Sequence, residues 1–321
     1  DIFPWDDELS EDIESGPFAF SHLEQPDLFL RVRPGMEAAV SQKLKKSEIT
    51  FETITANCLA LPNASKMDTI LELDREAVVQ DLNSQRVGEF MQLARPGSQQ
   101  GRIRRRIKDD QVSRGLQKDM FKGGLQEDMV KGELQEDRIR RGPSDPIRVW
   151  DCCAASGGKS IMAKDVLGDI ELFVSDLRES ILANLEDRFE RAGLGNYERF
   201  VADLSKPPAI FLPSFNLVIA DVPCTGSGTW GRTPEQLYYF DPLKIAKYAE
   251  LQKQIIQTVI AQVEPGGYLL YITCSVFKKE NEEQVAFLQE KFHLQMVKME
   301  LLKGYDKKAD TLFAALLKKS L

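Results

Sequence analysis

From residue 146 onward, short apolar runs alternate with segments whose apolar residues recur at helical intervals. Five runs rich in Val, Ile, Phe or Tyr are predicted to be strands: IRVWDC, ELFVSD, RFVAD, FNLVIAD and GYLLYITC. Helices are predicted in SIMAKDVL, SILANLEDRFERAG, PLKIAKYAELQKQIIQTVIAQV and ENEEQVAFLQEKF, and two further strands in HLQMVKM and TLFAALLKK. Strands that are apolar throughout are typical of sheets covered on both faces. The alternation therefore predicts an α/β fold with a doubly wound, mostly parallel sheet.

A smaller pattern precedes this one. Within residues 27–62, strands are predicted in DLFLRVR, ITFETI and NCLALP, and a helix in GMEAAVSQKLKK. We assign residues 1–75 to a small N-terminal α+β domain and residues 76–321 to the main domain.

Residues 97–145 interrupt the main domain with a different composition. GRIRRRIKDD is followed by three near-copies of nine residues, GLQKDMFKG, GLQEDMVKG and ELQEDRIRR. Residues 98–141 hold 12 Lys and Arg against 8 Asp and Glu, a net charge of +4 in a chain of net charge −8. Two interpretations stay open: a flexible or locally folded insertion, which is the commoner case, or a basic arm that contacts nucleic acid.

Composition excludes several classes of protein. Hydrophobic residues make up 42% of the chain and charged residues 29%, as in ordinary globular proteins. No apolar run reaches the roughly 18 residues that a membrane span needs, and the acidic N-terminus does not resemble a secretory signal. Five cysteines without a CxxC pair, and only two histidines, favour free thiols in a reducing, cytoplasmic compartment over disulfides or a metal site.

Acids and thiols end all five predicted parallel strands. The first strand ends at Asp151-Cys152, the second at Asp176, the third at Asp203, the fourth at Asp221 and Cys224, and the fifth at Cys274. One aspartate after a strand is usually only a turn or a helix cap. Because ligands of open parallel sheets bind beyond the carboxyl ends of the strands, five such ends together predict one site at this edge.

The loop after the first strand predicts the cofactor. It comprises Cys153, Ala154, Ala155, Ser156, Gly157, Gly158 and Lys159, and it matches neither a dinucleotide fingerprint nor a P-loop. Asp176 follows at about the distance typical of an acid that binds ribose hydroxyls. Asp203 could accept a hydrogen bond from an adenine amino group. An adenosine carrier without pyrophosphate fits this set, and S-adenosylmethionine fits it better than NAD.

The cysteines suggest a reaction. Carbon 5 of cytosine is a poor nucleophile until a thiolate adds to carbon 6 of the ring, after which carbon 5 can attack a sulfonium methyl group. Cys224 and Cys274 both end strands at the predicted site, and Asp221 stands three residues before Cys224. A buried inert thiol is the usual state of a cysteine. The PCTGSG setting of Cys224 instead predicts a tight, open loop.

These segments together resemble the RsmB/Sun-type (Nol/Nop/Sun) RNA cytosine-5 methyltransferases, over residues 78–85 and 148–317. The likeness rests on VVQDLNSQ, DCCAASGGKS, DVPCTGSGTWGRTPE, YITCSVFKKENEEQV and DTLFAALLKK, in this order. The resemblance implies a Rossmann-like fold, with S-adenosylmethionine as cofactor and RNA as substrate.

The resemblance also implies roles for single residues. Cys274 is the implied nucleophile, and Cys224 the thiol that helps to release the product. The implied cofactor contacts are Cys153 through Lys159, Asp176, Asp203 and Asp221, and Asp221 also faces the cytosine. Lys159 and Arg232 are expected RNA contacts, although a structural ion pair suits Arg232 equally well. The sequence departs from the family pattern at Ser156, where Pro is usual, and this is expected to loosen the cofactor loop.

We therefore expect a methyltransferase of ribosomal or transfer RNA that acts on single-stranded or locally opened RNA, as a monomer and without a metal. The acidic net charge opposes RNA binding. A local basic surface, to which the small domain contributes, would answer this objection: Arg31, Arg33, Lys43, Lys45, Lys46 and the run Arg102–Arg106. The alternatives are a methyltransferase of another substrate and an RNA-binding assembly factor whose site has decayed.

Overall fold

The computed structural model describes residues 2–95, 146–206 and 212–321. The predicted insertion at about 97–145 lies outside the described residues, so both interpretations of it stay predictions.

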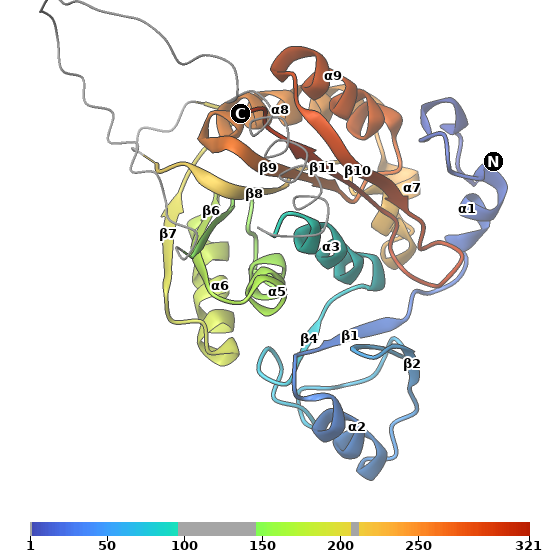
Figure 1. Cartoon of the computed structure of the whole chain (residues 1–321). Coiled ribbons are helices and arrows are strands. Elements are labelled where there is room, and N and C mark those ends of the chain that lie inside the picture. Colours follow the sequence, from blue (N-terminus) through green and yellow to red (C-terminus); the bar gives the residue numbers. More distant parts are fainter. Residues whose placement is uncertain (1, 96–145, 207–211) are drawn as a thin grey trace, which may run out of the picture. The chain divides into compact units, whose positions relative to one another are not determined.

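A seven-stranded sheet forms the centre of the main domain, with the strand order β10-β11-β9-β8-β5-β6-β7 (Figure 1). The strands are β5 (Ile147–Asp151), β6 (Ile170–Asp176), β7 (Tyr197–Val201), β8 (Phe215–Asp221), β9 (Val263–Thr273), β10 (Gln295–Leu302) and β11 (Leu312–Lys318). All seven lie where the apolar runs predict them. Strands β5 to β9 pair in parallel, whereas β11 is antiparallel to both of its neighbours, β9 and β10. The predicted Rossmann-like α/β fold is confirmed.

Helices cover both faces of the sheet. On one face α3 (Leu82–Leu93), α5 (Gly158–Leu167) and α6 (Glu179–Ala192) pack against alternate strand residues such as Val149 and Leu217. On the other face α8 (Leu243–Val259) and α9 (Glu282–Phe292) pack against the intervening residues, including Trp150 and Val218. The strands are therefore buried on both sides, which explains their continuous apolar sequences.

Helix α3 was not predicted. Its sequence, LNSQRVGEFMQL, has only a weak apolar stripe. The helix is specified by its ends and its packing: the Asp81 side chain caps it by accepting from the Asn83 N–H, and Val87, Phe90 and Met91 are buried against the sheet.

The small sheet has four antiparallel strands in the order β2-β3-β1-β4. They are β1 (Leu28–Val32), β2 (Glu52–Thr55), β3 (Cys58–Leu61) and β4 (Ala77–Val79), and α2 (Glu37–Lys46) packs on the sheet through Val40 and Leu44. The three strands and the helix expected here are present, and β4 was not predicted. The division of the chain at residue 75 stays a prediction, since β4 lies beyond it.

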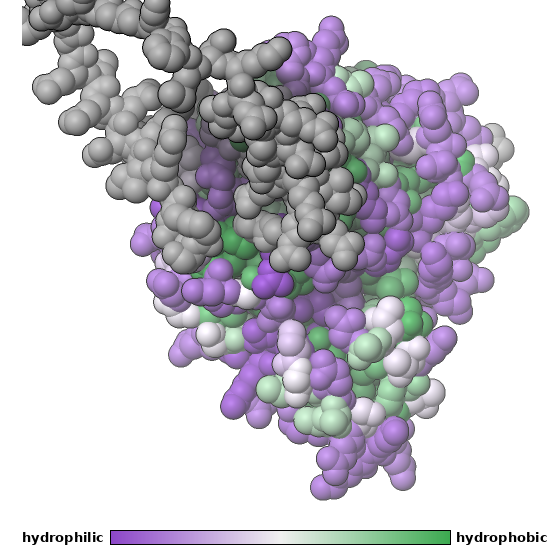
Figure 2. Space-filling view, viewed as in Figure 1, coloured by the Kyte–Doolittle hydropathy of each residue, from purple (hydrophilic) through white to green (hydrophobic). Residues whose placement is uncertain are grey.

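The expected basic surface on the small domain is wrong in part. Arg31 and Arg33 are buried in ion pairs with Asp165 of α5, at 2.6 and 2.8 Å, and Lys43 pairs with Glu76. The two arginines hold the small sheet against the main domain, and the carboxylates that they and Lys43 bind occupy groups that were expected to meet phosphate. Figure 2 nevertheless shows hydrophilic residues over most of the face turned to the viewer.

Residues 2–24 pack on the main domain, to the right in Figure 1. They contain a short 3₁₀ helix, η1 (Asp6–Glu8), and α1 (Ser15–Ser21). An aromatic cluster joins them to the main domain; it contains Phe3, Leu9, Phe18, Trp230, Ile245, Val276 and Phe277. Within the described part of the chain, no helix is long and apolar enough to cross a membrane.

Candidate active site

The carboxyl ends of β5, β6, β8 and β9 carry polar side chains at neighbouring positions of one edge. Asp151, at the end of β5, pairs in register with Val174 of β6 and with Ile219 of β8. Asp221, at the end of β8, pairs with Ile272, two residues before Cys274. The strand order thus brings together acids and thiols that lie far apart in the sequence, from Asp151 to Cys274.

The loop after β5 turns sharply over the end of β6. Ala155 and Gly157 both have positive φ values, 47° and 81°. The Ala155 N–H donates to Asp176 Oδ2 at 3.1 Å, and Arg178 N–H donates to Asp176 Oδ1 at 3.0 Å. A Cβ on Gly157 would lie 2.5 Å from Phe189 Cε1, so only glycine fits there. Asp176 therefore shapes the loop as well as standing at its edge.

Lys159 and Asp221 form an ion pair at the centre of this edge. Lys159 Nζ lies 2.5 Å from Asp221 Oδ2, and only 14% of the lysine side chain is exposed. Burial alone would lower the pKa of Lys159, but the charges of Asp221, Asp151 and Cys274 outweigh burial and raise it. Lys159 is therefore a fixed positive charge beside the thiols.

The two predicted cysteines are in contact. Cys224 Sγ and Cys274 Sγ lie 3.3 Å apart, and both side chains are partly buried. The hydrogen bond to Cys274, burial and the nearby Glu280 raise the pKa of Cys224 well above its usual value. Cys224 therefore keeps its proton and can donate it towards the sulfur of Cys274.

Glu280, which the sequence did not single out, ties the two cysteine loops together. It lies in η4 (Lys278–Glu280) and is fully buried. Its Oε2 accepts from the hydroxyls of Thr225 and Ser275, both at 2.5 Å, and its Oε1 accepts from Thr225 N–H and Gln252 Nε2, both at 3.0 Å. Thr225 follows Cys224 and Ser275 follows Cys274, so one carboxylate fixes both loops. The signal in the sequence was its place five residues after Ser275, in the segment YITCSVFKKENEEQV that carries part of the family resemblance.

Asp151 is the most deeply buried acid of the edge. Ser160 Oγ donates to its Oδ2 at 2.6 Å, while its Oδ1 is buried and has no hydrogen-bond partner among the residues that the structure describes. Burial raises the pKa of Asp151 to about 7, and the charges of Asp221 and Asp176 add to this effect.

Two other predicted residues are engaged in their surroundings. Asp203 lies in the loop after β7 and accepts from Ser205 and Lys206. Arg232 is the last residue of η2 (Ser227–Arg232), a short helix that follows the Cys224 loop. It pairs with Asp310 at 2.8 Å and with Asp81 at 2.9 Å. Arg232 therefore forms the structural ion pair that the sequence analysis gave as the alternative to RNA binding. Contact of Arg232 or Lys159 with RNA stays a prediction. In the described part of the chain, no group of three or more His, Cys, Asp or Glu is placed to hold a metal.

The sequence model of a family described as 16S rRNA methyltransferase RsmB/F matches residues 141–315, more than half of the chain. The chain belongs to this family. RsmB/F relatives include ribosomal RNA small subunit methyltransferase B of Salmonella paratyphi A, which is 31% identical over 150 residues. A probable ribosomal RNA small subunit methyltransferase B of Synechocystis is 33% identical over 153 residues. Both matches cover 46% of this chain and 34% of the relative, so the matched region spans about a third of the relatives' length.

Solved structures show the same fold as this RsmB/F chain. NSun6 from Pyrococcus horikoshii, determined with SFG, has a TM-score of 0.70 at 13% identity and covers 96% of this chain and 94% of its own. A methyltransferase homolog protein from Pyrococcus horikoshii has a TM-score of 0.66 at 17% identity and covers 97% and 92%. The likeness includes the small N-terminal sheet, since nearly the whole chain is covered.

Proposed function

We propose that this chain transfers a methyl group from S-adenosylmethionine to carbon 5 of a cytosine in RNA, with Cys274 as the nucleophile. The observation that carries the proposal is the pair of sulfurs 3.3 Å apart beside the Lys159–Asp221 ion pair. Two thiols at the carboxyl edge of a Rossmann-like sheet, in a chain of the RsmB/F family, fit this reaction.

The residues at the edge fit the cofactor. Asp176 Oδ2 accepts one hydrogen bond, from Ala155 N–H, and keeps a second lone pair, and Asp151 Oδ1 is a buried polar atom without a partner among the described residues. These groups, with Asp203 and Asp221, would hold S-adenosylmethionine. The bound cofactor supplies a methyl group on a positively charged sulfur.

The chemistry needs a thiolate and a positive charge. Cys274 would add as a thiolate to carbon 6 of cytosine, and the electrons of the C5–C6 double bond would then bind carbon 5 to the methyl carbon, while the bond between that methyl group and the sulfur that carries it breaks and leaves its electrons on the sulfur. The carbon 5 proton next leaves to a base, the double bond re-forms, and the carbon–sulfur bond breaks with its electrons returning to Cys274. The positive charge of Lys159 acts near Cys274, and Cys224 lies close enough to assist the release.

Asp221 is proposed to orient the base. Its carboxylate is 31% exposed and already fixed by Lys159, so it is accessible to a donor on the ring such as the exocyclic amino group.

Because the thiols lie within the edge of the sheet, the target cytosine must leave its stack, which favours single-stranded or locally opened RNA. The names of the family and its relatives favour ribosomal RNA of the small subunit over transfer RNA. The five free cysteines support the cytoplasmic compartment expected from the sequence.

Replacement of the nucleophile tests the proposal. Cys274→Ala should abolish transfer of labelled methyl groups to RNA, because the neighbouring thiol, Cys224, keeps its proton and is a poor nucleophile. Cys58→Ala is the matched control, since this thiol is buried in the small domain. Methylation by Cys274→Ala at the wild-type rate would refute the mechanism.

Replacement of the second thiol tests the release step. Cys224→Ala should accumulate a covalent RNA–protein adduct that survives a denaturing gel, because addition still occurs while release slows. The same gel with the double variant Cys224→Ala/Cys274→Ala should show no adduct. An active RNA that gives no adduct with Cys224→Ala would make Cys224 a structural thiol.

A further inference from the structure

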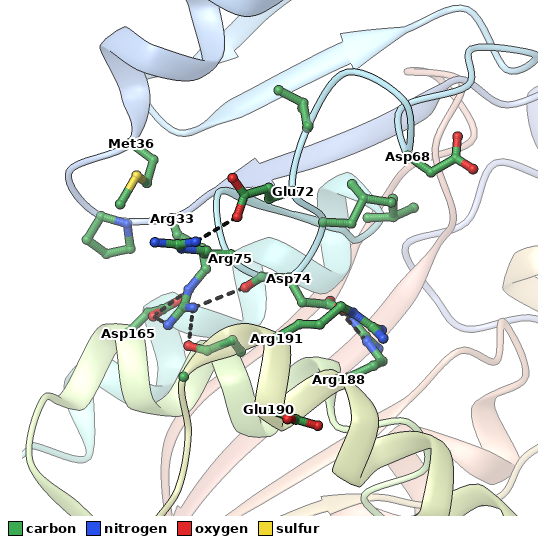
Figure 3. A pocket seen from close by; sticks show the side chains of 16 residues that line it. Arg33, Met36, Asp68, Glu72, Asp74, Arg75, Asp165, Arg188, Glu190 and Arg191 are labelled. Atoms are coloured by element: carbon green, nitrogen blue, oxygen red, sulfur yellow. Dashed lines mark hydrogen bonds and ion pairs between the residues drawn. The ribbon is translucent and has the colours of Figure 1, made fainter.

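A cavity of about 1260 Å³ lies away from the cysteines, between the small domain and helices α5 and α6 (Figure 3). Its lining carries four arginines and five acids, which Figure 3 labels. Each of the four arginines is paired with an acid of the lining. The paired charges do not favour an anionic ligand, but one of the arginines also reaches the cofactor loop.

Arg188 connects two parts of the molecule. Its Nε and Nη2 donate to Asp74 Oδ1 at 3.0 and 2.7 Å, and its Nη1 donates to the Ser156 carbonyl at 3.0 Å and to Ser156 Oγ at 2.8 Å. Asp74 lies in the turn before β4, and Ser156 lies in the loop from Cys153 to Lys159. The rigid planar guanidinium thus spans from the small domain to the cofactor loop, and its side chain is only 18% exposed.

Asp74 is itself held in place. Its side chain is 6% exposed, its N–H donates to Ala77 O at 2.8 Å, and its carbonyl accepts from Arg33 Nη1 at 3.0 Å. Arg191 donates to the second carboxylate oxygen at 2.9 Å. Burial alone would raise the pKa of Asp74, but Arg188 and Arg191 outweigh burial and lower it. Asp74 therefore offers Arg188 a fixed negative charge.

The cofactor loop needs such an external support. Ala155 has a φ of 47°, in the left-handed region that disfavours any residue with a Cβ. A strained conformation of this kind persists only where its neighbours fix it. Asp176 holds the loop on one side of the strained residue through Ala155 N–H, and Arg188 holds it on the other through Ser156.

We propose that Arg188 is a positioning residue for S-adenosylmethionine binding: anchored on Asp74 of the small domain, it holds Ser156 and so keeps the loop from Cys153 to Lys159 in its binding conformation. This inference rests on the proposed function, and it assigns the small domain a part in cofactor affinity as well as any part in RNA binding. By linkage, a change in how the small domain is held alters the affinity for the cofactor.

The test is the affinity of the full chain for S-adenosylmethionine, measured by calorimetry without RNA. Arg188→Gln should weaken binding about tenfold, the factor that corresponds to the loss of one charge-assisted hydrogen bond. Arg191→Gln is the matched control, because Arg191 also pairs with Asp74 but makes no contact with Ser156. It should bind within about twofold of the wild type.

Three further readouts separate positioning from a general loss of stability. The KM for the cofactor should rise in Arg188→Gln while kcat at saturating cofactor stays near the wild-type value. Adding Ser156→Ala to Arg188→Gln should weaken binding less than Ser156→Ala does alone, because the two residues act through one contact. Arg188→Lys should recover part of the affinity. A lysine keeps a positive charge that can pair with Asp74, but it lacks the planar guanidinium that reaches Asp74 and Ser156 together.

Each outcome decides the proposal. Wild-type affinity in Arg188→Gln, or an equal loss in Arg191→Gln, overturns it. If the wild-type chain does not bind S-adenosylmethionine, the proposed function fails, and hydrogen exchange of the amides of residues 154–158 then tests the positioning role alone. That exchange should be faster in Arg188→Gln than in Arg191→Gln, and equal rates would overturn the inference.

Discussion

The two cysteines at the edge of the sheet carry the same side chain in different surroundings. Cys224 lies near the Glu280 carboxylate, whereas the positive charge of Lys159 acts on Cys274. The positions of both cysteines, of Asp221 and of the glycine loop could be predicted, because each follows an apolar strand directly. The contacts of Glu280 with the two cysteine loops, and of Arg188 with the cofactor loop, could not be predicted. They depend on which loops the fold brings together.

Asp151 should make the stability of the protein depend on pH. Its pKa of about 7 in the folded state lies above the value near 4 of an unfolded chain. The stabilisation from its protonated form is therefore complete below about pH 4 and is lost as the pH rises to about 7, on the order of 4 kcal/mol in total. Urea unfolding of the wild type and of Asp151→Asn between pH 4.5 and 7.5 measures this.

The variant should lose less stability than the wild type over this range, since it has no proton to release. Asp187→Asn, on the exposed face of α6, is the control and should keep the wild-type dependence on pH. If Asp151→Asn has the same slope as the wild type, folding does not raise the pKa of Asp151.

The cysteine segments are held by elements that follow other strands. Gly228 of η2 donates its N–H to the Cys274 carbonyl at 2.8 Å and accepts from Thr311 N–H at 2.9 Å, just before β11. A Cβ on Gly228 would lie 2.0 Å from Thr311 O. The glycines of PCTGSG predicted a tight loop, but the strand that crowds it could not be foreseen. The antiparallel insertion of β11 between β9 and β10 places Thr311 there.

Glu280 should be essential as the link between the two cysteine loops. Glu280→Leu keeps the volume but removes the acceptor of four donors, which belong to Thr225, Ser275 and Gln252, and a buried donor left unpaired costs roughly 1–3 kcal/mol. We expect a clear loss of urea stability and loss of methyl transfer. Glu280→Gln should lie between, because its amide oxygen can still serve Thr225 N–H and Gln252.

Glu283→Gln provides the comparison, since Glu283 is exposed on the first turn of α9. It should match the wild type in stability and in activity. Full methyl transfer by Glu280→Leu would show that the loops keep their positions without this carboxylate.

At the scale of the whole molecule, the central sheet could be predicted because its strands are apolar on both faces. The placement of the N-terminal residues could not be. Phe3, Trp5 and Phe18 pack on Trp230 and Phe277, more than 200 positions later in the sequence, and no local pattern encodes such partners. The ion pairs of Arg31 and Arg33 with Asp165 are of the same kind, and they turned expected surface charges into buried ones.

The packing of residues 2–24 also sets an order of folding. Ser10 N–H donates to Val276 O at 2.8 Å, and Glu8 pairs with Lys279. Because translation proceeds from the N-terminus, Glu8 and Ser10 are synthesised more than 260 positions before these partners. Contacts of such long separation form late. During refolding, pulses of protease should still cleave residues 2–24 after β5 to β9 are protected, and simultaneous protection would contradict this order. Until Trp230 and Phe277 emerge from the ribosome, Phe3, Trp5 and Phe18 are a nascent-chain surface for chaperones to cover.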